Sequence, residues 1–230
     1  MEKSDLVTIL SKGVLGAIPF VGPLAAEIIG ATIPNQRIDR IESFLKIFES
    51  KLHEIDKNSI EEKITSPEHV DLLEDSFIQA TRALSEERKD FIASLMKNSL
   101  TDENLEYIEY KRLLSTLGEL NDFEIIILKS YSLDQCTQEY KDFMEIHEDS
   151  LRTPIIYMDA SIEDVNKEAI FQAHKTHLVN LGLLKPKFKK PKKGELPEFD
   201  EKTGMIKYNG YSLSPLGRLL LKTIDQSCEE

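Results

Sequence analysis

Two histidines have the most suggestive spacing for chemistry in this chain of 230 residues. His174 and His177 stand three residues apart, which brings their side chains to one face of a helix. Such a pair can share a metal ion with further ligands, but the sequence has neither Cys-x-x-Cys nor His-Glu-x-x-His spacing, so core or groove positions are favoured. Cys136 and His147 lack the signature of a cysteine nucleophile. We therefore predict no catalytic residue, no metal ligand, no cofactor and no small-molecule substrate, and hence a protein that is not an enzyme.

A dense run of lysines is the second feature that could bind a ligand. Six of them fall within residues 185–193, and another lies in the helical segment before that run. On a wing, such charges could contact phosphates, which gives affinity for nucleic acid without sequence reading, whereas a solvated charge run is the alternative. The helical segment contains no arginine, so the bidentate contact to guanine is not open to it. The candidate residues for nucleic-acid or anion contact are Lys175, Lys185, Lys187, Lys189, Lys190, Lys192 and Lys193.

Residues 14–33 form the longest apolar stretch. Its nine Val, Leu, Ile and Phe residues favour membrane insertion by roughly 3 to 5 kcal/mol, and Glu27 costs about 3 kcal/mol, so a single span is not favoured. Glu27 and the mixed charges before the stretch also argue against a signal peptide. Gly22 and Pro23 suit a break followed by a second helix, which predicts a helical hairpin. The hairpin either packs against protein or serves membrane insertion or oligomerisation.

A heptad pattern follows the hairpin. Apolar residues recur at intervals of three and four from Ile38 to Ile55, which predicts a helix with one apolar seam. Packing within a helical bundle and self-association are the two interpretations of this seam. The candidate surface for self-association or partner contact combines both segments: Ile18, Phe20, Val21, Leu24, Ile38, Ile41, Leu45, Phe48 and Leu52.

Capping signals predict a run of further helices. Ser66, followed by Pro67, suits a helix start, and so do Ser85, Thr101 and Asn121, each followed by acidic residues. Helices joined by short connectors are therefore expected as far as residue 130.

The chain after Asn121 follows a different pattern. Residues 154–158 suit a short strand, and Ser161 suits the cap of a helix that ends near Gly182. Ile170, Ala173, His177, Leu178, Leu181 and Leu184 are expected on one face of that helix. Two strands are then expected, with 211–213 pairing to the strand near 184–188. A last helix is expected to start after Ser214.

This order resembles a winged-helix domain, and the segments "HLVNLGLL" and "YSLSPLGRLLL" are similar to the recognition helix, wing and last helix of bacterial regulators. Together with "FIASLMKNSL" and "EYKRLLSTLGELNDFEIIIL", they are similar to the abortive-infection alpha family of bacterial proteins. The first resemblance implies binding of DNA or protein. The second implies antiviral defence and brings no catalytic motif.

Charge and cysteine content complete the prediction. The net charge is −12, but residues 165–230 carry 12 Lys/Arg against 8 Asp/Glu, so an acidic half precedes a basic one. Two widely separated cysteines favour the reducing cytoplasm, and contact with the inner membrane is a further option.

The expected fold is mainly α: a hairpin (1–33), a helical bundle region (34–120) and a winged-helix domain with a small β-ribbon (121–230). The expected function is that of a non-enzymatic interaction protein of phage defence, with self-association, a protein partner or a membrane surface as its contact. The alternative is a nucleic-acid-binding regulator that uses the wing at 185–193.

Overall fold

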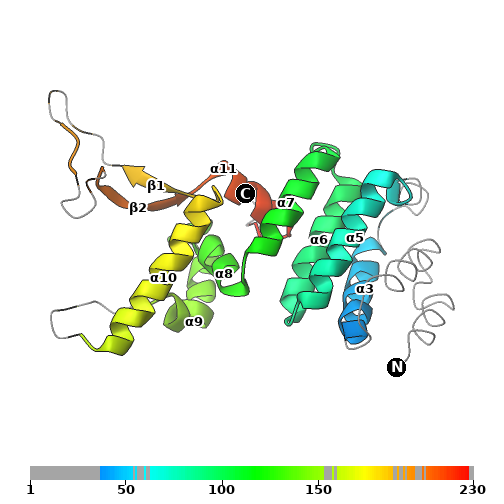
Figure 1. Ribbon diagram of the computed structural model, residues 1–230, viewed down its shortest axis with the longest axis horizontal. Coiled ribbons are helices and arrows are strands. Elements are labelled where there is room, and N and C mark those ends of the chain that lie inside the picture. Colours follow the sequence, from blue (N-terminus) through cyan, green and yellow to red (C-terminus); the bar gives the residue numbers. More distant parts are fainter. Residues whose placement is uncertain are drawn as a thin grey trace. The chain divides into compact units, whose positions relative to one another are not determined.

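The computed structural model describes most of the chain after residue 36 (Figure 1). The described residues are 37–53, 55, 60, 63–152, 157, 160–188, 191, 194, 196–199, 204 and 206–227. The predicted hairpin, with Ile18, Phe20, Val21 and Leu24, lies outside them, as does most of the predicted strand at 154–158. Among the described helices, none has the length and apolar character needed to cross a membrane.

The described chain is mainly helical, with one antiparallel sheet of two strands, and these two coarse predictions are confirmed. It separates into two compact units. The first ends at Glu119 and also includes Thr223–Asp225, because Asn98 donates to the carbonyl of Thr223 at 2.8 Å and to Asp225 at 2.9 Å. The second comprises Leu120–Lys222 and the residues from Gln226 onward.

The described part of the first unit contains four helices: α3 (Ile38–Leu52), α5 (Pro67–Arg82), α6 (Glu86–Thr101) and α7 (Tyr107–Glu119). Two of their starts are capped as predicted. Ser66 Oγ accepts from the backbone N–H of His69, and Ser85 Oγ accepts from that of Arg88. These bonds satisfy amide groups that the first turn of a helix leaves without a partner.

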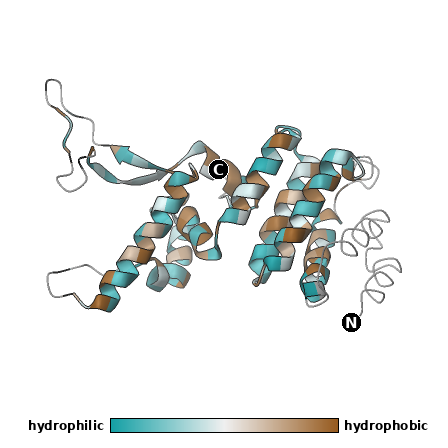
Figure 2. Cartoon of the chain, in the orientation of Figure 1, coloured by the Kyte–Doolittle hydropathy of each residue, from teal (hydrophilic) through white to brown (hydrophobic). Residues whose placement is uncertain are grey.

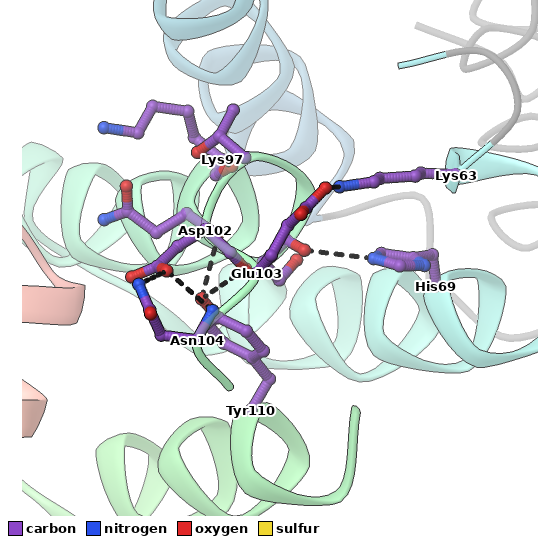
Figure 3. Close-up of polar contacts among 10 residues, drawn as sticks. Lys63, His69, Lys97, Asp102, Glu103, Asn104 and Tyr110 are labelled. Carbon is purple, nitrogen blue, oxygen red and sulfur yellow. Dashed lines mark hydrogen bonds and ion pairs between the residues drawn. The ribbon is translucent and has the colours of Figure 1, made fainter. Parts of the chain in front are cut away.

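The predicted cap at Thr101 is wrong. Thr101 is the last residue of α6, and its hydroxyl donates to the carbonyl of Lys97 at 3.1 Å. Asp102 turns the chain instead, because its carboxylate accepts from the backbone N–H of Asn104 at 2.9 Å (Figure 3). Tyr110 closes the loop by donating to the carbonyl of Asn98 at 3.0 Å, and its burial raises its pKa to about 12.

The heptad seam of α3 lies in the core of the first unit. Ile41, Leu45, Phe48 and Leu52 are at most 2% exposed, and α3 packs on α5 and α6. Phe44 anchors this core: its ring stacks on Phe48 and meets the ring of Phe77 edge-on at 5.8 Å. Apolar residues of these helices are brown in Figure 2.

Bundle packing is therefore the correct interpretation for those four residues of the seam. Their assignment to a partner surface is wrong, since their side chains are already covered within the unit. Ile38 is the first residue of α3.

Within its described residues, the second unit contains three helices, a ribbon and a last helix: α8 (Asp122–Ser130), α9 (Gln138–Leu151), α10 (Ile162–Asn180), β1 (Leu184–Phe188), β2 (Tyr208–Leu213) and α11 (Pro215–Thr223). The strands pair with Leu184 opposite Leu213 and Pro186 opposite Tyr211, so the predicted pairing is confirmed. The caps at Asn121 and Ser161 are confirmed as well. Helix α9 is not among the predicted elements, although Thr137 caps it.

Hydrogen bonds join the end of α10 to the start of α11. Gly182 has the left-handed φ of 75° that ends α10, and Leu183 donates to the carbonyl of Leu178 at 2.9 Å. Ser214 Oγ donates to the carbonyl of Gly182 at 2.6 Å and accepts from the N–H of Gly217 at 2.9 Å. Gly182, Ser214 and Gly217, which belong to the segments that resemble a winged helix, are thus linked by hydrogen bonds.

Replacing Gly217 by alanine is expected to destabilise the second unit by about 1–3 kcal/mol. A Cβ at this position would lie 2.4 Å from the backbone carbonyl oxygen of Leu183, so the backbone itself must shift. Urea unfolding followed by circular dichroism measures the change. Gly118→Ala is the matched control, because its Cβ would meet only the movable end of Gln79. Equal stability of the two variants would contradict the packing argument.

Candidate functional site

A buried carboxylate and two histidines form the most unusual polar cluster of the second unit. Glu124, in the first turn of α8, has a side chain only 4% exposed. His174 Nδ1 lies 3.0 Å, and His177 Nδ1 2.9 Å, from the same oxygen, Glu124 Oε1. The other oxygen, Oε2, accepts from the backbone N–H of Asn121 at 3.0 Å. Glu124 therefore joins α10 to the capped end of α8.

The hydrogen bonds keep this carboxylate charged. Burial raises the pKa of Glu124, but the bonds from Asn121 and from the two imidazoles outweigh it, so the pKa lies below its ordinary value. Each imidazole that donates to Glu124 must carry its proton on Nδ1. This arrangement is typical of a structural contact that holds two helices together, and we name Glu124, His174 and His177 the clamp. No group of three His, Cys, Asp or Glu in the described part of the chain could hold a metal ion.

Aromatic rings and Lys175 extend the clamp. The ring of Phe123 lies 6.0 Å from that of Phe171 and 5.4 Å from that of His174. Lys175 Nζ lies 4.4 Å from the centre of the Phe171 ring, and burial lowers the pKa of Lys175. Lys175, a candidate for anion contact, is thus packed over an aromatic ring rather than extended into solvent.

The remaining candidate lysines lie on the ribbon or outside the described residues. Lys185 and Lys187 are exposed on β1 and make no ion pair in the part of the chain that the structure describes. Lys189, Lys190, Lys192 and Lys193 lie outside the described residues. Lys207, which is not among the predicted residues, is exposed just before β2.

The residues predicted to share one face of α10 are not equally covered. Ile170 is 60% exposed and Ala173 is exposed too, whereas Leu178 is buried. Phe171 takes the inward position instead. The exposed residues that share the outward side are Ile162, Val165, Asn166, Ala169, Ile170, Ala173 and Thr176, which we name the α10 face.

Two groups of ion pairs in the first unit join residues that are distant in sequence. Lys111 on α7 contacts both Asp71 and Asp75 on α5, the latter at 2.8 Å. The hydrogen bond from Lys111 lowers the pKa of Asp71. Near the α6–α7 loop, Lys63 pairs with Glu103 at 3.4 Å (Figure 3). The Lys111 pairs hold α7 against α5, and the Lys63 pair holds the loop after α6.

Cys136 and His147 do not form a pair. Cys136 is exposed and unbridged, and the ring of His147 packs against Phe143, with centroids 4.6 Å apart. No contact between Cys136 and His147 is present in the described part of the chain.

Comparison with known proteins brings no relative: no family model, no curated protein and no solved structure matches this chain.

Proposed function

We propose that this chain is a non-enzymatic interaction protein whose second unit is a winged-helix-like module that binds a protein partner through the α10 face. The order of elements supports the module, because three helices, a ribbon and a last helix follow one another as in a winged helix. Such modules serve both DNA and protein binding, so the fold leaves the class of partner open.

The charge of α10 is the observation that favours a protein partner. Its two lysines are both engaged, since Lys167 pairs with Glu163 at 2.7 Å and Lys175 lies over Phe171. The α10 face carries no charged residue, and its Ile162 is 81% exposed. A helix that enters the major groove needs cations for phosphates and donors for base edges. Exposed apolar area without charge is instead typical of the centre of a protein interface.

Nucleic-acid binding through the ribbon is the second candidate. Lys185 and Lys187 favour it, since both are exposed on β1. Binding of this kind would fall steeply with salt, because each phosphate contact releases counterions. Fluorescence anisotropy with duplex DNA at two salt concentrations tests it.

Phage defence is the proposed biological setting, and it rests on the resemblance to the abortive-infection alpha family. Expression of the full chain in a bacterial host, followed by plaque counts with a panel of phages, tests this setting. A reduced plaque number would support it, and unchanged numbers across the panel would contradict it.

A photo-cross-linking amino acid at Ala173 in the full chain is expected to give covalent adducts with protein in bacterial cells. Adding Ile170→Glu should reduce their yield about tenfold or more, because a charge would then be desolvated in the interface. Leu84→Glu is the matched control, as Leu84 is 83% exposed in the first unit. Adducts that nuclease removes, or no adducts at all, would contradict a protein partner.

A further inference from the structure

Helix α9 presents an acidic outward side. It carries five acidic residues and one lysine, and none of its residues is fully buried. Asp142, Glu145 and Asp149 recur at intervals of three and four and are all exposed, so they form one line along the helix. Beside this line, Ile146 is 76% exposed.

The ribbon of the same unit presents the opposite charge. Lys185, Lys187 and Lys207 are exposed on or beside its two strands. Phe188 pairs with Tyr208 across the strands, and these two rings are 55% and 46% exposed. Lysines interleaved with aromatic rings thus lie on one element, and acids beside an apolar side chain lie on the other.

Two of these side chains have polar partners within their own unit: Asp142 accepts from Gln138 Nε2 at 2.7 Å, and the hydroxyl groups of Tyr208 and Tyr211 lie 2.9 Å apart. α9 packs on α8, and β1 packs on α10 and β2. Glu145 and Asp149 make no ion pair within the described residues, as is also true of Lys185 and Lys187. Arg152 pairs only loosely with Glu148, at 3.9 Å.

We propose that the ribbon of one copy docks on α9 of a second copy of this chain. Lysines of the ribbon would meet the acidic line, and Phe188 and Tyr208 would cover Ile146. Two different surfaces meet in such a contact, so it repeats from copy to copy as an open chain or a closed ring. The contact goes beyond the proposed function, since it uses no residue of the α10 face. A chain with a net charge of −12 otherwise repels its copies, so opposite charges are needed where two copies meet.

Sedimentation velocity of the full chain tests the proposal. We expect assemblies larger than the 26.3 kDa monomer at about 50 mM salt, and an apparent dissociation constant at least about tenfold weaker at about 500 mM salt. Two charge-reversed variants should each sediment as monomers. The ribbon variant carries Lys185→Glu, Lys187→Glu and Lys207→Glu; the helix variant carries Asp142→Lys, Glu145→Lys and Asp149→Lys.

Reversing the charges of both surfaces should restore assembly, which tests whether these two surfaces contact each other. Neither variant alone should assemble, but mixing the two should restore assemblies in which the variants alternate, because each surface of one variant then meets a surface of opposite charge on the other. One chain with all six reversals should assemble again. The matched control reverses three other exposed lysines, Lys46, Lys167 and Lys222, and should assemble like the unmodified chain. Circular dichroism confirms that each variant is folded.

Three outcomes would overturn the proposal: a monomeric chain at low salt, assemblies that survive either reversal, or no assembly when both surfaces are reversed. Salt-dependent binding to duplex DNA by a monomeric chain, lost in the ribbon variant, would assign the lysines to nucleic acid instead. The cross-linking at Ala173 is measured separately, so failure of one proposal is distinguishable from failure of the other.

Discussion

Replacing Glu124 by alanine is expected to lower the free energy of unfolding of the second unit by about 3 kcal/mol or more. The substitution leaves the Nδ1 groups of His174 and His177 and the backbone N–H of Asn121 without their common acceptor. It also leaves a cavity between α8 and α10. Because the chain has two units and no tryptophan, hydrogen exchange of peptides from α8 and α10 is the suitable measurement.

An exposed glutamate of the same unit is the control. Glu148→Ala should change stability by less than about 0.5 kcal/mol, since its side chain is 61% exposed. Equal losses for Glu148→Ala and Glu124→Ala would contradict the role of the buried clamp.

The effect of Glu124 should also depend on pH. Its pKa is lower in the folded chain than the ordinary value of 4.5. The stability that the charged carboxylate contributes is therefore fully present above pH 4.5 and is lost as the pH falls through the folded pKa. The difference between the unmodified chain and Glu124→Ala should shrink in that acidic range, and a constant difference would contradict this sign.

Replacing Phe77 by alanine is expected to destabilise the first unit by about 3–5 kcal/mol. The ring of Phe77 is fully buried and meets the ring of Phe44 edge-on, so its removal leaves a cavity between α5 and α3. Urea unfolding with hydrogen exchange of peptides from α3, α5 and α6 measures the loss.

Two further substitutions separate burial from other effects. Phe77→Leu keeps most of the volume and should cost less than about 1.5 kcal/mol. Leu84→Ala should change stability by less than about 0.5 kcal/mol, because Leu84 is 83% exposed. A loss for Leu84→Ala as large as that for Phe77→Ala would contradict the position of the core.

Helix starts could be predicted because their causes are local. Ser66, Ser85 and Asn121 cap helices through hydrogen bonds that span only three residues, and Gly182 ends a helix through its own backbone freedom. Thr101 does not cap a helix, because a threonine hydroxyl can either cap a helix start or bond back to a carbonyl of the preceding turn. It bonds back to Lys97 at the end of α6 rather than opening α7.

The contact of His174 and His177 with Glu124 could not be predicted from the periodicity of the sequence. The spacing of His174 and His177 predicts that they share one face of a helix, and the Asn-x-x-Glu motif at 121–124 places Glu124 in the first turn of another. Only the packing of α10 on α8 brings both imidazoles to one carboxylate oxygen, and this contact spans at least fifty residues of chain.

The sequence by itself determined the helical class, the capped starts of four helices and the pairing of the ribbon. The hydrogen bonds that cap these helices join residues only three positions apart, so they do not depend on distant elements. Tertiary structure decided which apolar residues are covered: it buries Ile41, Leu45, Phe48 and Leu52 between helices and leaves Ile162 and Ile170 exposed. Both groups lie at helical spacing, and the partner that covers a helical face comes from elements distant in sequence, which periodicity alone does not encode.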